Sequence, residues 1–263
     1  MRLGAALSRT KIRDRNLSFR EHDLAEILLQ VAAFVAAFFQ SVVGIGFGMV
    51  AGPVVLMVLE DPAAVVISTL MSWLIAVVLW PSLRRGADWA MLKRLAVGAA
   101  LGLPFGLALL VFAGIAGLKL IAGLVIGGLT AAMVFGLPGV RTPGRGMDVA
   151  FGVLGGVFGG CLAIPGPPAV MRMNGLGYPK AVTRATMVTF FCCIWPVIFA
   201  GQWAVIGVSS VTLWNALMLV PATLAGVLVG NWAASRVSER FFRNLVLVFL
   251  CGTSVSLLVD AVL

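Results

Sequence analysis

Long apolar runs, separated by short clusters of charged residues, make up most of this chain. A helix needs about 20 apolar residues to cross the hydrocarbon core of a bilayer, and the longest run is sufficient for two crossings. The pattern therefore predicts an all-α polytopic membrane protein with about eight transmembrane helices. The uncharged runs cover residues 27–59, 62–83, 95–118, 120–140, 149–171, 185–235 and 244–259.

The first run is too long for one ordinary helix, and glycines interrupt its middle. Gly44, Gly46 and Gly48 predict one break, and Gly52-Pro53 predicts another. Irregular backbone is tolerated at membrane depth only where protein or a water-filled cavity surrounds it. We therefore expect a broken helix or a partial re-entrant turn that lines the interior of the protein.

The same order of features returns in the second half of the chain. Glycines crowd residues 155–160, prolines follow at 165–168, and Pro179 opens the next apolar run as Pro62 does in the first half. Many transporters consist of such repeats, with the substrate site at broken helices near the membrane midplane. The sequence thus predicts two four-helix repeats, which would be inverted if each glycine-rich stretch were a hairpin returning to its own side. The predicted units are a cytoplasmic basic tail (1–26), a first repeat (27–136), a linker (137–147) and a second repeat (148–263).

Composition supports the membrane assignment, because 61% of the residues are hydrophobic and only 11% are charged. The net charge of +9 comes from basic residues at the ends of the apolar runs. Such residues contact lipid headgroups and set orientation, so we expect membrane lipid and no nucleic acid as a partner. With eight spans, the distribution of Lys and Arg places both termini in the cytoplasm. A homo-oligomer is compatible with this pattern.

Metal and cofactor chemistry is not expected from this sequence. The single histidine, His22, lies in the tail, and the four cysteines lie inside apolar runs without the spacing of metal ligands. An intramembrane enzyme would need a catalytic pair or a metal cluster at depth, and neither is present in the pattern. We therefore expect no catalytic residues.

Backbone N–H groups at helix breaks form anion sites, because they are unpaired and lie at the positive end of a helix dipole. We assign this role to Gly46, Gly48, Gly159 and Gly160. Glycine also serves close helix packing in lipid, which is the alternative for all of them. That packing role is expected for a second set, at Gly98, Gly102, Gly226 and Gly230.

Hydroxyl groups near the start of two apolar runs would complete such a site by donating to an oxyanion. The candidates are Ser68, Thr69, Ser72, Thr186 and Thr189. The alternative is that each hydroxyl bonds to a carbonyl of its own helix. Arg184 adds a guanidinium, whose planar fork suits sulfonate, carboxylate or phosphate oxygens. Because no carboxylate falls in the middle of a predicted span, a proton relay is not expected.

At these residues the sequence resembles the sulfite exporter TauE/SafE family of membrane permeases. The family pattern is a glycine-rich break, a proline-led turn and a Gly-Thr-Ser segment that opens the next helix, all of it repeated. The first copy here is GIGFGMVAGPVVL followed by DPAAVVISTLMS, and the second is GGVFGGCLAIPGPPAVMRMNGLGYPKAVTRATMVT. The residues 67–69 and 184–186 depart from Gly-Thr-Ser.

The resemblance implies a secondary transporter of the bacterial inner membrane that exports sulfite, sulfoacetate or related sulfonates. An interior-negative potential favours the exit of an anion by about 2.3 kcal/mol per charge per 100 mV, so export needs no coupling ion. Two alternatives stay open at this point. One is an uptake permease for a similar anion, coupled to protons or sodium, and the other is a membrane scaffold or interaction protein.

Overall fold

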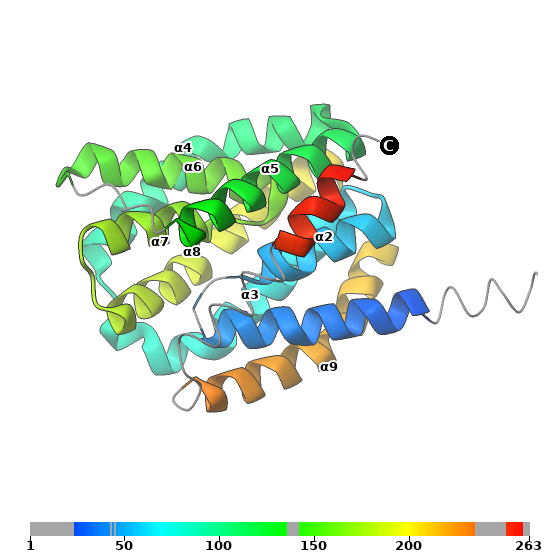
Figure 1. Cartoon of the computed structure of the whole chain (residues 1–263), viewed down its shortest axis with the longest axis horizontal. Coiled ribbons are helices and arrows are strands. Elements are labelled where there is room, and N and C mark those ends of the chain that lie inside the picture. Colours follow the sequence, from blue (N-terminus) through cyan, green and yellow to red (C-terminus); the bar gives the residue numbers. More distant parts are fainter. Residues whose placement is uncertain (1–23, 43, 45, 136–141, 235–250, 260–263) are drawn as a thin grey trace, which may run out of the picture.

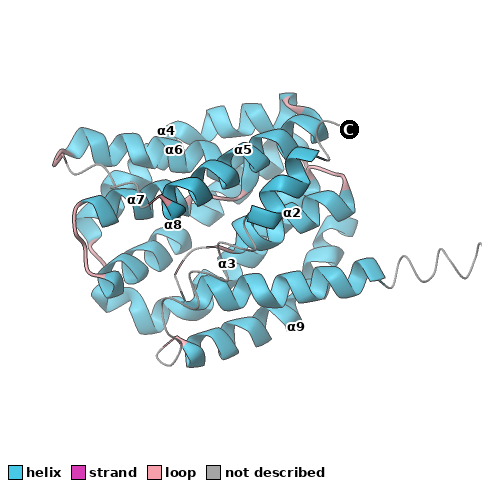
Figure 2. Ribbon diagram, viewed as in Figure 1, coloured by secondary structure: helices cyan, strands magenta, loops and turns pink. Residues whose placement is uncertain are grey.

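A computed structural model of the protein describes residues 24–42, 44, 46–135, 142–234 and 251–259, and every regular element in this part is a helix (Figures 1 and 2). In chain order these are the first helix (Leu24–Val42), α2 (Phe47–Leu59), α3 (Ala63–Leu83), a short 3-10 helix η1 (Arg84–Gly86), α4 (Trp89–Phe112), α5 (Gly114–Val134), α6 (Arg145–Leu162), α7 (Gly166–Gly175), α8 (Lys180–Ile206), α9 (Ser210–Ala233) and a helix over 251–259.

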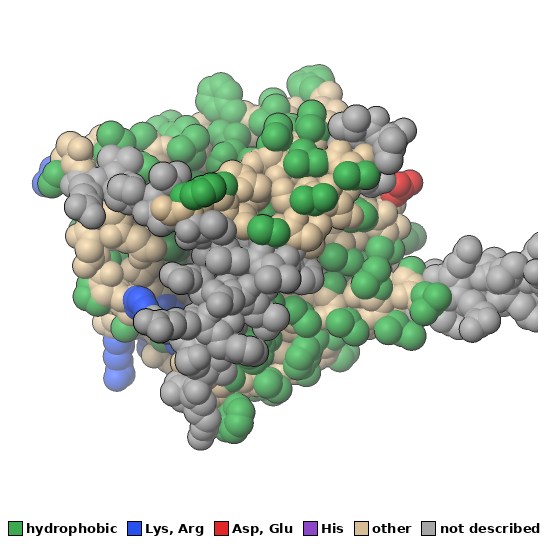
Figure 3. Space-filling view, viewed as in Figure 1, with side chains coloured by type: hydrophobic (Ala, Val, Ile, Leu, Met, Phe, Trp, Pro, Cys, Tyr) green, Lys and Arg blue, Asp and Glu red, His purple; other side chains and the backbone are tan. Residues whose placement is uncertain are grey.

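Six of these helices are long and apolar enough to cross a membrane: the first helix, α3, α4, α6, α8 and α9. Large apolar side chains such as Phe105, Phe112 and Trp203 are exposed, as expected of a surface in contact with lipid. Hydrophobic side chains are spread over the face seen in Figure 3. The all-helical, multi-pass fold is thus confirmed for the described residues. The total of about eight spans is not confirmed, because only six of the described helices are of sufficient length, and the last expected span lies largely outside the described residues.

The first predicted break is present, because the first helix ends at Val42 and α2 begins at Phe47. Between them Gly46 has a φ of 135°, in the region that favours glycine. The further break predicted at Gly52-Pro53 is wrong, since α2 continues through both residues. Proline inside a helix removes one hydrogen bond, whereas a complete break in an apolar interior leaves several backbone groups unpaired.

The second glycine-rich stretch forms two helices instead of the single span predicted from its apolar run. α6 ends at Leu162, Ala163 takes a left-handed φ of 57°, and α7 begins at Gly166 directly after Pro165. Two further prolines in the first turn of α7 are tolerated because the first N–H groups of a helix have no intrahelical partner. The breakers therefore divide this run at one point only.

The apolar run 185–235 predicts two crossings, with Gly201-Gln202 and Ser209-Ser210 as markers of the turn between them. The second pair is correct, because α8 ends at Ile206, Gly207 takes a φ of 72° and α9 begins at Ser210. The first pair is wrong, because Gly201 and Gln202 lie inside α8. Gly201 allows close packing of α8, because a Cβ at this position would lie 2.7 Å from a methyl carbon of Leu107. Gln202 is fully buried, so it is an interior residue of the bundle and not a loop residue.

The first helix and α2 form a hairpin. The first helix lies beside α9 and runs parallel to it, since Phe34 packs against Gly226 and Phe38 against Gly230 (Figure 1). It therefore runs toward the end of the molecule at which α9 finishes. α2 then runs back toward the end at which the first helix begins. It ends at Leu59, with Glu60 as its C-cap.

α6 and α7 form a second hairpin, which enters from the opposite end. α6 runs parallel to α4 (Figure 1). α7 then returns toward the start of α6, because its Arg172 reaches Asp148 there. The Nε of Arg172 donates to Asp148 Oδ1 at 2.6 Å, and the Nε of Arg94 pairs with the other oxygen of the same carboxylate at 2.8 Å. The starts of α4 and α6 and the middle of α7 therefore meet at one end of the molecule.

We call this end the basic end, because it gathers most of the described Lys and Arg residues. Eight-span topology placed residues 84–94 and 172–184 on opposite sides of the membrane, and the shared Asp148 contact shows that this assignment is wrong. The hairpins explain the error. Each was counted as one crossing of the membrane, but each returns to the side from which it entered. Lys and Arg side chains lie on the left of Figure 3. The basic end as a whole, including residues that this view does not show, comprises Arg84, Arg85, Lys93, Arg94, Arg145, Arg172, Lys180 and Arg184.

Glycines make the closest helix contacts in the bundle. Gly98 and Gly102 bring α4 so near to α6 that a Cβ on Gly102 would lie 2.0 Å from the Val153 carbonyl oxygen. Gly226 and Gly230 bring α9 against the first helix in the same way. The packing role predicted for these four glycines is therefore confirmed.

Candidate functional site

The tips of the two hairpins meet inside the bundle. Gly48, in the first turn of α2, lies so close to Ala163 at the α6–α7 break that a Cβ on Gly48 would be 2.0 Å from the Ala163 carbonyl oxygen. Both residues are buried. The two glycine-rich stretches, which are far apart in the sequence, thus form one structural feature.

A pocket, here called the tip pocket, lies between these tips. The first residues of α2 and of α7 both line it, so the positive ends of two helix dipoles face the same space. Side chains from the first helix, α3 and α8 close it. No Lys, Arg, Asp or Glu belongs to its lining. The lining residues that matter below are Gln40, Gly46, Gly48, Ser72, Gly166 and Trp195.

Two buried donors in the tip pocket have no hydrogen-bond partner. They are the Ser72 hydroxyl and the Trp195 Nε1–H, on residues that are 1% and 2% exposed. A buried polar group without a partner costs roughly 1–3 kcal/mol. Gly166, the first residue of α7, also lines the pocket and has a backbone N–H. The next two residues, Pro167 and Pro168, have none, so Gly166 is the N–H donor of this first turn. A ligand with several acceptor oxygens would satisfy this set of donors.

Gln40 is a site residue that sequence-based reasoning missed. Its Oε1 accepts the Phe47 N–H at 3.1 Å, and its Nε2 donates to the Ser72 carbonyl oxygen at 3.2 Å. The side chain is 2% exposed and lies across the break between the first helix and α2. The available signal was an uncharged polar residue inside an apolar run, just before the glycine-rich break.

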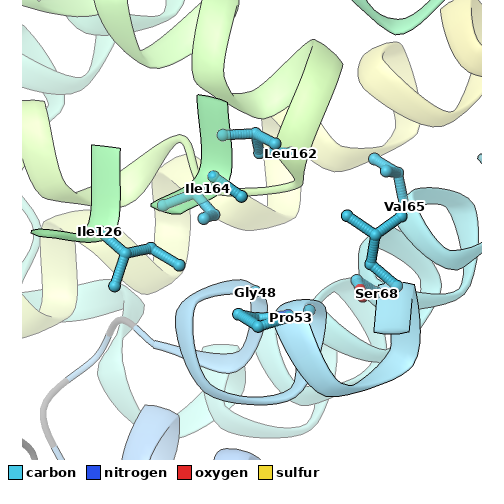
Figure 4. Close-up of a pocket in the computed structure, with 10 residues that line it drawn as sticks. Gly48, Pro53, Val65, Ser68, Ile126, Leu162 and Ile164 are labelled. Carbon is cyan, nitrogen blue, oxygen red and sulfur yellow. The ribbon is translucent and has the colours of Figure 1, made fainter. Parts of the chain in front are cut away.

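A second, mostly apolar pocket lies beside the tip pocket and shares Gly48 and Ile164 with it. Figure 4 shows Gly48 and Pro53 of α2 facing Leu162 and Ile164 of the second break, with Ser68 of α3 at the side. The Ser68 hydroxyl is fully buried and has no partner. This pocket therefore adds one more free hydroxyl close to the hairpin tips.

The predicted hydroxyls divide into three groups. Ser68 and Ser72 line the pockets just described. Thr69 and Thr189 donate to carbonyls one turn earlier in their own helices, at 3.0 and 2.8 Å, which is the alternative role. Thr186 accepts a backbone N–H from the loop before α4 at 2.9 Å, at the basic end.

Gly159 and Gly160 lie in the last turn of α6, where their N–H groups belong to the helix interior. Their carbonyl groups point toward the C-terminal end of α6. The Ala163 N–H donates to the carbonyl of Gly159 at 3.1 Å. The carbonyl of Gly160 accepts the Nε2–H of Gln202 at 3.2 Å, while the Oε1 of Gln202 has no partner. The N–H groups at this break therefore come from α7 and not from the two glycines.

Arg184 contacts the first break from outside the pockets. Its Nε donates to the Ser41 carbonyl oxygen at 3.0 Å, and its Nη2 donates to the same oxygen and to Asn231 Oδ1. The guanidinium therefore caps the C-terminal end of the first helix, where a positive charge is favourable. Gly44 packs on the aliphatic part of the same side chain. The geometry gives Arg184 a positioning role at the break.

Separate polar contacts connect the helices at the two ends of the bundle. At the basic end, the Tyr178 hydroxyl donates to Asp88 Oδ2 at 2.7 Å, and the Met91 N–H donates to Asp88 Oδ1 at 2.9 Å. The Met91 N–H lowers the pKa of Asp88, and the bond to Asp88 raises the pKa of Tyr178. At the other end, Lys119 Nζ bonds to Glu60 Oε1 at 3.1 Å. Each hairpin is thus tied to neighbouring elements at its open end.

Among the residues that the structure describes, no group of three or more His, Cys, Asp or Glu side chains could hold a metal ion. The four cysteines are free thiols, and Cys161 is buried in α6. The polar groups that line the two pockets are N–H groups, hydroxyls and one amide.

A family model described as sulfite exporter TauE/SafE matches residues 29–257, which is most of the chain. No curated protein and no solved structure matches the sequence. The matched segment contains both hairpins and both pockets.

Proposed function

Because the chain belongs to the sulfite exporter TauE/SafE family of membrane transporters, we propose that it is a secondary transporter that exports small sulfur-containing anions across the bacterial inner membrane. Sulfite, sulfoacetate and related sulfonates are the proposed substrates. One observation carries the proposal: the N-termini of α2 and α7 face a single buried pocket with two unpaired donors, Ser72 and Trp195. Sulfur oxyanions carry negative charge and several acceptor oxygens, which is what this pocket lacks.

The anion would be held by N–H groups, hydroxyls and helix dipoles, without a fixed positive charge in the lining. A hydrogen bond to a charged group contributes about 1.5–3 kcal/mol, so a few such bonds bind the ion without trapping it. The indole N–H of Trp195, the hydroxyl of Ser72 and the backbone N–H groups of Gly48 and Gly166 are the proposed donors. A carrier needs this moderate affinity, because it must release its substrate on the other side.

In this conformation the tip pocket has room for about one water molecule, so it is closed. The hairpins enter from opposite ends, and we propose that withdrawal of one tip opens the pocket toward that hairpin's own end. This differs from a movement of one sequence half against the other. The first helix packs on α9 and α4 packs on α6, so the two halves are interleaved.

We propose that the basic end faces the cytoplasm. Lys and Arg concentrate on the cytoplasmic side of membrane proteins, and this end holds most of the described basic residues, whereas the other end holds Glu60 and Asp61 with Lys119. Leu24 then lies at the outer face, in contrast to the orientation predicted from eight spans. Labelling of cysteines introduced at Arg85 and Asp61 with a membrane-impermeant maleimide tests this, in a background without the native cysteines. Labelling of the Arg85 position alone in intact cells would refute the orientation.

The function itself is tested by flux in proteoliposomes under an imposed voltage, with sulfite, sulfoacetate, taurine, sulfate and acetate compared. We expect voltage-driven movement of at least one sulfur anion, reduced about tenfold or more in Trp195→Phe, because one charge-assisted bond is lost. Trp203→Phe, on the lipid-exposed side of the same helix, is the matched control. Flux that requires a sodium or proton gradient would favour the uptake alternative. Absence of flux for every anion would refute transport and support a scaffold role.

A further inference from the structure

The carboxamide of Gln40 occupies the place in the tip pocket at which an anion would bind. We infer that Gln40 is a built-in competitor for the transported anion: its oxygen caps the N-terminus of α2 in the empty pocket, and an oxygen of the anion replaces it. The inference rests on the proposed transport function and adds a residue that sets the affinity.

The position of the side chain supports this role. Phe47 is the first residue of α2, and its N–H is one of the groups that a bound anion would use. Gly46, the residue at the N-cap position, has no side chain that could accept this N–H. The Oε1 of Gln40 reaches it from the first helix at 3.1 Å, while its Nε2 is held by the Ser72 carbonyl at 3.2 Å.

Gln40 leaves part of the pocket unsatisfied. The Ser72 hydroxyl and the Trp195 indole N–H are buried in the same lining and have no partner while Gln40 is in place. The carboxamide has one oxygen, so it caps the helix but does not serve all three donors. An oxyanion with three oxygens at different directions from its central atom serves the helix N-terminus, the hydroxyl and the indole together. The ligand class that best displaces Gln40 is therefore a small oxyanion with at least three oxygens.

This arrangement also gives the empty carrier a stable closed form. When the anion leaves, the neutral carboxamide returns to the Phe47 N–H and keeps that group from being buried without a partner. The same bond must be broken each time an anion enters. Gln40 thus lowers the affinity for substrate by the free energy of the bond that it makes in the empty pocket.

The test uses the full chain in detergent and in proteoliposomes, with sodium sulfite as the probe. Gln40→Met keeps the length of the side chain and removes its oxygen, so we expect the dissociation constant for sulfite to fall about two- to tenfold. Gln40→Glu keeps the shape and places a carboxyl group at the N-terminus of α2, where the helix dipole favours its ionised form, so we expect sulfite binding to be lost near neutral pH. Gln30→Met and Gln30→Glu, in the same helix but outside the pocket, should bind as the unaltered protein does. Binding is read from the sulfite-dependent rise in melting temperature and from the half-saturating concentration of flux.

The outcomes separate this inference from the proposed function. If the unaltered protein neither binds nor moves any sulfur anion, the proposed function fails. If it binds sulfite and Gln40→Met binds equally or more weakly, the competitor role is overturned, because Gln40 then serves only to hold the break. Should Gln40→Met fail to fold, Gln40→Glu still decides, because affinity close to that of the unaltered protein in that variant overturns the inference as well.

Discussion

The contact between the hairpin tips makes Gly48→Ala a sharp test of the site. The added Cβ would lie 2.0 Å from the Ala163 carbonyl oxygen and 2.9 Å from its carbonyl carbon. A carbon and a carbonyl oxygen in contact are normally about 3.3 Å or more apart, so one tip must move by roughly 1.3 Å. Both partners are backbone atoms, and no side-chain rotation relieves the clash. Overpacking of this kind costs about 1–3 kcal/mol, and the shift separates the donors that face the tip pocket.

Gly52→Ala is the matched control, one turn further along α2. Its Cβ would meet the Ser68 hydroxyl at 3.8 Å and the Leu162 carbonyl oxygen at 3.9 Å, which are ordinary contact distances. Alanine in place of glycine inside a helix stabilises it by up to about 1 kcal/mol, so this variant should be as stable as the unaltered protein or more so. We expect sulfite flux in proteoliposomes to fall at least about tenfold in Gly48→Ala and to persist in Gly52→Ala. Equal flux in the two variants, at equal reconstitution, would refute the role of the tip contact.

Three further predictions concern the packing and the basic end. Asp148→Asn removes the buried carboxylate that joins two arginines, and it should lower the free energy of unfolding in detergent by about 3–5 kcal/mol; a loss below about 1 kcal/mol would contradict this. Gly102→Ala should lower the melting temperature, because its Cβ would clash with backbone of α6, whereas Gly128→Ala, with nothing within 4 Å, should not. The pKa of Asp88 is lowered in the folded protein, so its stabilising contribution is present above its unfolded pKa and is lost as the pH falls through its folded pKa. The pKa of Tyr178 is raised in the folded protein, so its contribution is present below its unfolded pKa and is lost as the pH rises through its folded pKa. Asp88→Asn should therefore remove both effects in a pH series of melting temperatures, and an unchanged pH profile would count against the contact.

Local sequence chemistry was sufficient to predict the two helix breaks but not the paths of the chain around them. Several glycines precede α2, and Pro165 stands beside two further prolines, so helix termination follows from backbone preferences there. Pro53 is the one proline in α2. This helix packs against α3 and α5, and its burial keeps it continuous through Pro53. Whether a break leads onward or back depends on contacts with α4 and α9, which local preferences do not contain.

The candidate site shows the same division between local and tertiary information. Gly46 and Gly48 were predicted from their places at a break, and Ser72 from its place near the start of an apolar run, and all three line the tip pocket. The local signal for Gln40 was its polarity inside an apolar run, just before the glycine-rich break. Trp195 reaches the pocket only because α8 packs beside the hairpin tips, and nothing in its neighbouring residues signals that contact. The role predicted for Arg184 depended on the fit of its charged guanidinium to the oxygens of an anion. A helix C-terminus satisfies that charge as well as a substrate would, and sequence alone does not distinguish the two.

The pairing of the first helix with α9 has a consequence for how the protein is made. Gln30 and Met218, which bond across this pair, are 188 positions apart. At about 5–20 residues per second, the ribosome completes this part of α9 roughly 10–40 s after the first helix has emerged. During that interval the backbone at Phe34 and Phe38, which packs against Gly226 and Gly230 in the finished protein, has no α9 to pack on. Lipid or the insertion machinery must cover this face, so the helix that is synthesised first is secured only after most of the chain has been made.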